Sequence, residues 1–322
     1  MQSRRRQRSI QEDISNLNIW FIGTGPFASL CLEGLNKRGV TFNRIITGLP
    51  TRSGRNGKEN PSPVELKAVS LGLNVSRTGK LNDNHELMHE LEVNNPDVIF
   101  VIDFGQIIRE PFLSYMCLNI HPSLLPEYRG AAPVQRALID GHSRTGVSVF
   151  RLVKAMDAGD VIAQREVEIA PEDDAEDLYI RLADIGSELA YESLNHIHEL
   201  RFTHQDETLA TYANKLDKKE FEVSFEMTAD RIINTVRALA MSGGAYIMIR
   251  KKRVKLWRVS LHNNMKDSEC GRVMKLDDSL VVSCADCAVE IREIQSEGKN
   301  IMSGIEWSRG LRLKEGDMLC SV

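Results

Sequence analysis

The chain has 322 residues, of which 42% are hydrophobic and 27% charged, a composition that predicts a soluble globular protein of about two domains. Its net charge of −4 gives no general attraction to nucleic acid, so any such contact must come from a local basic patch. Six widely spaced cysteines exclude a dense secreted disulfide scaffold and favour a reducing compartment.

The N-terminal extension, residues 1–17, begins "MQSRRRQRSI", in which four Arg are followed by no hydrophobic segment. This pattern excludes a secretory signal and predicts a disordered basic tail. We therefore expect the protein in a bacterial-type cytoplasm. The alternative is that these residues are a short organellar transit peptide, which would place the protein in the mitochondrial matrix. No apolar run approaches the roughly 20 residues of a membrane span, and no membrane partner is expected.

Residues 18–205 alternate between apolar strand-like segments and amphipathic helical ones. This order predicts an α/β domain, a Rossmann-like and mostly parallel sheet with helices on both faces. The expected strands and helices, in chain order, are 17–25, a helix after it, 42–50, the helix and short strand in 64–75, the helix 83–95, 96–105, 117–123, the helix 133–141, 145–153, 160–169 and the long helix 175–200.

From residue 206 the composition changes. "HQDETLATYANKLDKKEFEVSF", residues 204–225, is polar and predicts an exposed linker with a helix start. An amphipathic helix at 229–240 and several short alternating strands follow it. Residues 206–322 are therefore predicted to be a linker plus a small C-terminal OB-like β-barrel.

Three short motifs suggest chemistry that we do not expect. "GTGPFA", residues 23–28, resembles a dinucleotide loop, but no Asp or Glu follows the next strand to hold a ribose. "HELMH", residues 85–89, has the zinc protease spacing, yet Glu92 and Asn95 stand where the longer form of that motif has Gly and a third His. Cys284 and Cys287 make one CxxC without a second pair. The sequence therefore predicts neither a nicotinamide cofactor nor a metal.

A fourth set of residues is more promising. Asn119 and His121 end an expected strand, and Asp157 lies in a D-x-G turn just before another strand. Chemistry in such sheets gathers at the carboxyl ends of strands, so an amide, an imidazole and a carboxylate can converge there. They can stabilise an oxyanion and manage a proton, and no paired nucleophile is evident. This favours direct transfer between two bound substrates; a buried hydrogen-bonded network is the alternative.

The run Asn119-Ile-His-Pro-Ser-Leu-Leu-Pro126, followed by Asp157-Ala-Gly159, resembles the signature of the folate-dependent formyltransferases. The resemblance implies that Asn119, His121 and Asp157 are the catalytic trio and that 10-formyltetrahydrofolate is the formyl donor. It also implies a folate cleft bordered by two short segments, Ser123, Leu124, Leu125 and Pro126 in the first and Phe104, Gly105 and Gln106 in the second.

Further motifs resemble the branch of that family that acts on initiator methionyl-tRNA. They are "FIGTGPFA", "SGRNGK", "PSPV", "YRGAAPVQRAL", "TGVSV" and "QDETLATYANKLDKKE". This branch implies tRNA contacts from the loop with Arg52, Arg55 and Lys58 and from the basic segment with Lys251, Lys252 and Arg253. A sugar-amine formyltransferase with the same trio and a non-catalytic RNA-binding protein are the alternatives. Nothing demands more than a monomer.

Two segments depart from the family pattern. "RALAMSGGAY" has Met241 and Gly243 where the family often has a proline-rich turn, which leaves the shape of that turn open. The first loop reads Thr24-Gly-Pro-Phe27 where the family commonly has Thr-Pro-Asp-Phe or Thr-Pro-Glu-Phe.

Overall fold

A computed structural model describes residues 14–53, 58–262, 267 and 269–319. The chain divides into two compact units that are not consecutive in sequence. The first unit comprises the chain up to Arg129, Gly146–Val167 and Tyr179–Thr211, and the second comprises Gly130–Thr145, Glu168–Leu178 and the chain from Tyr212 onward. Each unit is described below by itself.

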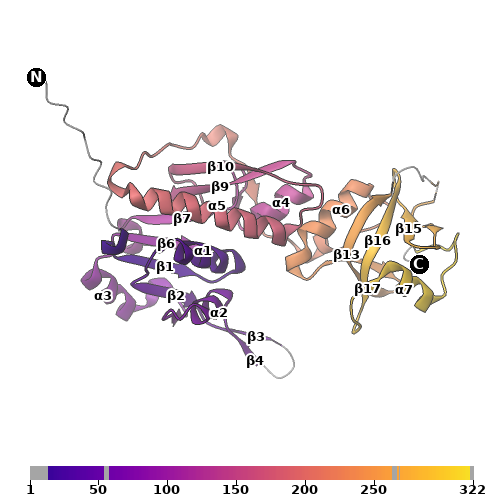
Figure 1. Cartoon of the computed structure of the whole chain (residues 1–322), viewed down its shortest axis with the longest axis horizontal. Helices are drawn as coiled ribbons and strands as arrows, with labels where there is room; N and C mark the ends of the chain where they lie inside the picture. The colour runs from indigo at the N-terminus through magenta and orange to yellow at the C-terminus, as the bar shows by residue number, and fades with distance from the viewer. Residues whose placement is uncertain (1–13, 54–57, 263–266, 268, 320–322) are drawn as a thin grey trace, which may run out of the picture. The chain divides into compact units, whose positions relative to one another are not determined.

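A seven-stranded sheet organises the first unit (Figure 1). Strands β1, β2, β5, β6 and β7 pair in parallel, whereas β9 is antiparallel to β7. The predicted mostly parallel α/β sheet is thus confirmed. The strands, in spatial order, are β10 (Val161–Glu168), β9 (Arg144–Arg151), β7 (Cys117–His121), β6 (Val98–Ile102), β1 (Ile19–Gly23), β2 (Arg44–Gly48) and β5 (Ser76–Thr78).

Helices cover both faces of this sheet because neighbouring strand residues point to opposite sides. Leu87 and Leu91 of α3 belong to one buried cluster with Trp20 of β1. On the other face, Gly186 of α5 lies against Ile120, where a β-carbon would meet the Ile120 side chain. The helices of this unit are α1 (Pro26–Lys37), α2 (Pro63–Ser70), α3 (His85–Asn94) and most of α5 (Ala175–Asn195), whereas α4 (Pro133–Ile139) lies in the second unit.

Short strand pairs complete this part of the chain. Strands β3 (Thr51–Ser53) and β4 (Lys58–Asn60) form an antiparallel pair, and β8 (Arg129–Gly130) pairs with β11 (Tyr212–Ala213). Among the residues that the structure describes, no helix combines the length and the apolar character that crossing a membrane requires.

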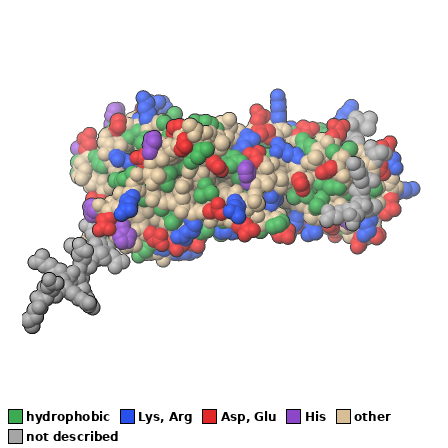
Figure 2. Space-filling view, turned by 90° about the horizontal axis from the view of Figure 1, so that it is seen from above, with side chains coloured by type: hydrophobic (Ala, Val, Ile, Leu, Met, Phe, Trp, Pro, Cys, Tyr) green, Lys and Arg blue, Asp and Glu red, His purple; other side chains and the backbone are tan. Residues whose placement is uncertain are grey.

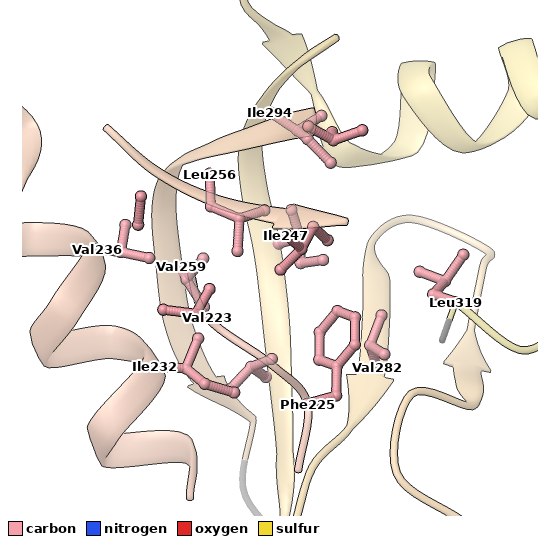
Figure 3. Packing of buried hydrophobic residues seen from close by; sticks show 14 of the residues in the cluster. Val223, Phe225, Ile232, Val236, Ile247, Leu256, Val259, Val282, Ile294 and Leu319 are labelled. Carbon is pink, nitrogen blue, oxygen red and sulfur yellow. The ribbon is translucent and has the colours of Figure 1, made fainter. Parts of the chain in front are cut away.

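The second unit contains the predicted small antiparallel β domain. Its strands and helices are α6 (Ala229–Ala238), β12 (Ala245–Ile249), β13 (Lys252–His262), β14 (Val273–Lys275), β15 (Leu280–Ser283), β16 (Ala288–Ser296), β17 (Met302–Ser303) and α7 (Gly304–Leu311). Figure 3 shows side chains from α6 and from the strands, such as Ile232, Leu256 and Val282, packing into one apolar core. α4 also belongs to this unit, where Arg231 of α6 donates to the Ile139 carbonyl at 3.0 Å.

The turn whose family prolines are absent has a defined shape. After α6 a short 3-10 turn covers Ala240–Ser242, and Gly243 and Gly244 both adopt positive φ angles of 97° and 83°. The Gly244 N–H donates to the Leu239 carbonyl at 3.0 Å, which closes the helix end. Glycine adopts these angles without steric cost, so the two glycines allow the chain to turn after α6.

Candidate active site

The site is built at the carboxyl end of β7. Asn119 and His121 are two residues apart and therefore point to the same side of the strand, whereas Ile120 points to the opposite face under α5. His121 is buried, and its ring lies edge-on to Phe150 of β9 at a centroid distance of 6.3 Å. Burial and the contact with Phe150 together restrict the orientation of the imidazole ring.

Both ring nitrogens of His121 face oxygen atoms. Nε2 lies 2.9 Å from the carbonyl oxygen of Tyr128, and because a carbonyl only accepts, this nitrogen carries the proton and donates. Nδ1 lies 3.9 Å from Oδ2 of Asp157. Nδ1 is therefore the nitrogen through which His121 can exchange a proton, and the Asp157 carboxylate is placed to stabilise the resulting positive charge.

Asp157 is presented by a loop between β9 and β10. The Arg151 N–H donates to the Asp160 carbonyl at 2.9 Å and closes the neck of this loop. Asp157 adopts a φ of 51°, a left-handed conformation that is uncommon for a residue with a side chain. At Gly159 the chain runs so close to Arg151 that any β-carbon would overlap the Arg151 carbonyl oxygen. The glycine is therefore required by close approach.

Asn119 carries an unsatisfied group. Its Oδ1 is buried and accepts no hydrogen bond from any residue in the described part of the chain. Leaving a buried acceptor unpaired costs about 1–3 kcal/mol, and such atoms concentrate at functional positions. The structure therefore brings Asn119, His121 and Asp157 together at one edge of the sheet, with unused polar capacity at Asn119.

The Ser123–Pro126 loop is only partly available to a ligand. Ser123 is buried and its hydroxyl donates to the Glu127 carbonyl at 2.6 Å, while Leu125 is buried as well. Leu124 and Pro126 are half-buried. Of the four residues expected to border the cleft, these last two have side chains that an apolar ring system can reach.

The segment after β6 is likewise only partly available to a ligand. Gly105 is exposed and has open space around it, and Phe104 is half-buried. The Gln106 side chain is used within the protein, since it accepts from the Leu81 N–H at 2.9 Å and donates to the Gly79 carbonyl at 2.8 Å. The amide of Gln106 is therefore already paired within the protein.

The glycine loop after β1 has no free anion site. The Asp103 carboxylate lies at the start of α1 and accepts from the Phe27 N–H at 3.2 Å. A β-carbon on Gly25 would collide with this carboxylate. In a dinucleotide-binding fold the cofactor phosphate occupies that position, so the Asp103 charge opposes it. The pKa of Asp103 is raised because the surrounding protein desolvates it, an effect larger than the lowering by the Phe27 and Ala28 N–H groups.

The two sequence motifs with metal-ligand spacing lie elsewhere in the protein. His85 and His89 of the "HELMH" motif are exposed on α3. Cys284, Asp286 and Cys287 approach one another within 4.8 Å, but Oδ1 of Asp286 already accepts the Ala229 N–H at 2.9 Å. Burial raises the pKa of the Cys284 thiol to about 12, which keeps it protonated.

The described residues among those expected to contact tRNA belong to two pairs of strands and the turn of one of them. Arg55 lies outside the described residues, and Arg52 and Lys58 belong to β3 and β4. Arg250 and Lys251 form the tip between β12 and β13, both with positive φ angles, and Lys251, Lys252 and Arg253 are exposed. On the face that Figure 2 displays, basic and acidic side chains are interspersed, in keeping with the small net charge.

One part of the site was not foreseen. Residues 204–225 were expected to form an exposed linker, yet Gln205 and Ala213 are buried. The expectation of full exposure was wrong because a polar side chain that is completely hydrogen-bonded can be buried in a polar stretch. No pattern in the sequence marks Gln205 apart from its neighbours; only its place within a motif that resembles the family singled out the segment.

Comparison with known proteins identifies the family of the chain. The family model described as "Formyl transferase" matches residues 17–194, and the model described as "Formyl transferase, C-terminal domain" matches residues 215–312. Among solved structures, a methionyl-tRNA formyltransferase from Clostridium thermocellum is similar with a TM-score of 0.56 and 18% identity, over 77% of this chain and 95% of that one. A sugar 3N-formyl transferase, WlaRD, is similar with a TM-score of 0.61 and 18% identity, over 88% of this chain and 99% of the other. These structures show a shared fold.

Sequence relatives are more specific. The methionyl-tRNA formyltransferase of Caldicellulosiruptor saccharolyticus is 34% identical over 310 residues, covering 94% of this chain and 100% of the relative. That of Halothermothrix orenii is 36% identical over 316 residues with the same two coverages. Because both family models match and the relatives align over their full length, the chain belongs to the formyl transferase family, in the group of the methionyl-tRNA formyltransferases.

Proposed function

We propose that the chain transfers the formyl group of 10-formyltetrahydrofolate to the α-amino group of methionine on initiator methionyl-tRNA. The observation that carries this proposal is the placement of Asn119, His121 and Asp157 at one strand end, with Nδ1 of His121 facing the carboxylate at 3.9 Å. The relatives named as methionyl-tRNA formyltransferases support the choice of acceptor. The compartment is one where initiation uses formylated tRNA, a bacterial cytoplasm or an organelle matrix.

The chemistry requires no covalent enzyme intermediate. The neutral amine, whose ordinary pKa is about 8, attacks the formyl carbon on N10 of the folate, and the carbonyl electron pair moves to oxygen. Asn119 donates a hydrogen bond to this oxyanion; one such donor is worth about 3 kcal/mol. The proton shed by the amine passes to His121 Nδ1, where Asp157 balances the charge. The oxyanion then re-forms the carbonyl as the C–N10 bond breaks, and N10 takes up the proton held on His121 Nδ1. This leaves tetrahydrofolate, N-formylmethionyl-tRNA and a neutral His121.

The folate is proposed to lie against the two cleft segments. Leu124 and Pro126 offer apolar surface, while Phe104 and the open main chain at Gly105 offer a second wall. Ser123 and Gln106 contribute by holding these segments, since their side chains are paired within the protein. The hydroxyl of Ser148 adds a further tie by donating to the Ser123 carbonyl at 2.6 Å.

The tRNA is proposed to meet the β12–β13 hairpin and the β3–β4 loop. Arg250 and Lys251 occupy left-handed conformations that cost non-glycine residues free energy, and such strain is typical of functional positions. Arg253 lies over the Tyr246 ring at 4.7 Å, which orders its guanidinium for phosphate contact. Such contacts make tRNA affinity depend on salt concentration.

A transfer assay tests the proposal. The chain is supplied with 10-formyltetrahydrofolate and with charged initiator tRNA and nucleotide-linked amino sugars in parallel. We expect formylmethionine on the tRNA, and loss of product when His121 is replaced by Ala. His89→Ala, the same exchange at an exposed histidine of α3, serves as the matched control and should keep activity.

The assay separates the alternatives. Formylated sugar with untouched tRNA would retain the chemistry and overturn the acceptor. Binding of tRNA without any transfer would favour a non-catalytic RNA-binding protein. Full activity of the His121→Ala variant would remove His121 from the mechanism.

A further inference from the structure

Gln205 is 4% exposed, and its side-chain amide is fully hydrogen-bonded. Nε2 donates to the carbonyl oxygens of Asp157, at 2.8 Å, and Gly159, at 2.6 Å. Oε1 accepts from two nitrogens of Arg129, Nε at 3.0 Å and Nη2 at 2.8 Å. These four bonds use both donors and both acceptor positions of the amide.

The orientation of this amide is fixed by chemistry. Arg129 has only donors and the two loop carbonyls only accept, so the oxygen must face Arg129 and the NH2 group must face the loop. Arg129 is itself 2% exposed, and its charge is balanced by Glu207, which accepts at 2.9 and 2.7 Å. This bond lowers the pKa of Glu207 and keeps it ionised near neutrality.

Arg129 is also linked to His121, through the main chain of its neighbour Tyr128. Arg129 follows Tyr128 directly, and the Tyr128 carbonyl accepts from His121 Nε2 at 2.9 Å. The main-chain N–H groups of Tyr128 and Arg129 are tied to Thr211, at 2.8 and 2.9 Å. The imidazole is thus anchored on one side of Arg129, and the Asp157 loop is anchored through Gln205 on the other.

Asp157 needs such an anchor. Its φ of 51° is unfavourable for a residue with a side chain, and conformations of this kind persist only where the surroundings over-determine them. The bonds from Gln205 act on the carbonyls of Asp157 itself and of Gly159, at the two ends of the turn. They therefore set the distance between the carboxylate and His121 Nδ1.

We infer that Gln205 is a positioning residue for the transfer reaction, which holds the Asp157 loop at its working distance from His121. This inference rests on the proposed roles of Asp157 and His121. A shift of about 1 Å in a reacting group can lower a rate by about a hundredfold. Loss of the two donors of Gln205 should therefore act on the chemical step more than on substrate binding.

Gln205→Glu in the full-length chain is the sharpest test. It keeps an oxygen for Arg129 but sets a second oxygen, in place of the donors, against the two loop carbonyls. We expect kcat to fall by about 30- to 100-fold while KM for folate and for tRNA stays within about threefold. Gln295→Glu is the matched control, because Gln295 also donates to a carbonyl, that of Lys299, and accepts from Trp257. It should leave kcat unchanged.

A double-mutant cycle with Asp157→Asn distinguishes positioning from general stability. If Gln205 acts through Asp157, the double variant should be no slower than Asp157→Asn alone. A merely structural role would instead lower both activities by the same factor and would appear as a lower melting temperature. Gln205→Met, of similar length without donors, replaces Gln205→Glu if that variant does not fold.

The outcomes are separable. If Asp157→Asn is slow but Gln205→Glu and Gln205→Met keep kcat within threefold, the inference is overturned and the proposed function stands. Multiplying effects in the double variant would overturn it as well. If Asp157→Asn keeps the wild-type kcat, the proposed role of Asp157 fails and the inference fails with it.

Discussion

Replacing Gly159 by Ala should separate the catalytic loop from His121 with a single methyl group. A β-carbon there would overlap the Arg151 carbonyl oxygen, and it would lie 2.9 Å from the carbon of that carbonyl and 3.4 Å from Val153 Cγ1. The carbonyl belongs to β9 and cannot withdraw, because Arg151 is paired with Leu118 of β7. The loop must move instead, by about 1 Å, which lowers rates by about a hundredfold, or 2.7 kcal/mol of activation free energy.

The loss should appear in kcat measured by formyl transfer at saturating folate and tRNA. Overpacking costs about 1–3 kcal/mol of stability, so thermal unfolding is measured alongside to confirm that the variant is folded at the assay temperature. Gly310→Ala in α7 is the control, because no atom lies within 4 Å of the added carbon. It should keep kcat and gain up to about 1 kcal/mol of stability. A folded Gly159→Ala variant with wild-type kcat would refute the argument from close approach.

Three further changes have defined outcomes. Asn119→Ala should lower kcat by about a hundredfold through loss of an oxyanion donor, and an unchanged kcat would exclude that role. Asp103→Asn should become more stable relative to the wild type as pH rises above 3.8, the ordinary pKa of an Asp side chain. The pKa of Asp103 is raised in the folded state, so its ionisation costs folding free energy that the Asn variant does not lose. Urea unfolding at several pH values measures the difference in stability, and a difference that does not change with pH would contradict the argument. Replacing Lys251 and Lys252 by Ala should raise KM for tRNA and flatten its dependence on salt, by about 0.9 in logarithmic slope per lost phosphate contact, and an unaltered slope would exclude this hairpin.

The strand ends could be predicted because they depend on a local pattern. An apolar run followed by Asn119 and His121 indicates a buried strand with polar side chains at its end, and β7 does end at His121. The alternation of strands and helices was enough for the sheet, since each segment must bury one apolar face. The turn at Met241 was left open, and two glycines with positive φ angles now define it.

The direction of individual polar side chains could not be predicted. Ser123 and Gln106 lie in segments that we expected to border the folate, yet their side chains are hydrogen-bonded within the protein, Ser123 to the Glu127 carbonyl and Gln106 to the main chain of Gly79 and Leu81. Gln205 contacts Arg129, 76 residues away, and Asp157, 48 residues away. Partners this distant are set by the packing of the whole unit, so a polar residue in a polar segment gives no local sign of burial.

The first loop, which departs from the family pattern, and Asp103, the acid that follows β6, meet at the start of α1. The family pattern that this sequence resembles has an acidic residue just before the Phe of this loop, whereas Pro26 stands before Phe27 here. The first turn of α1 still receives a carboxylate, from Asp103 at the neighbouring strand end, which accepts from the Phe27 N–H at 3.2 Å. Gly25 leaves the space that this carboxylate fills, since any β-carbon there would collide with it. An anion favours the positive end of a helix wherever in the chain it comes from. In this chain the carboxylate at the start of α1 therefore comes from the residue that follows β6, and not from the loop itself.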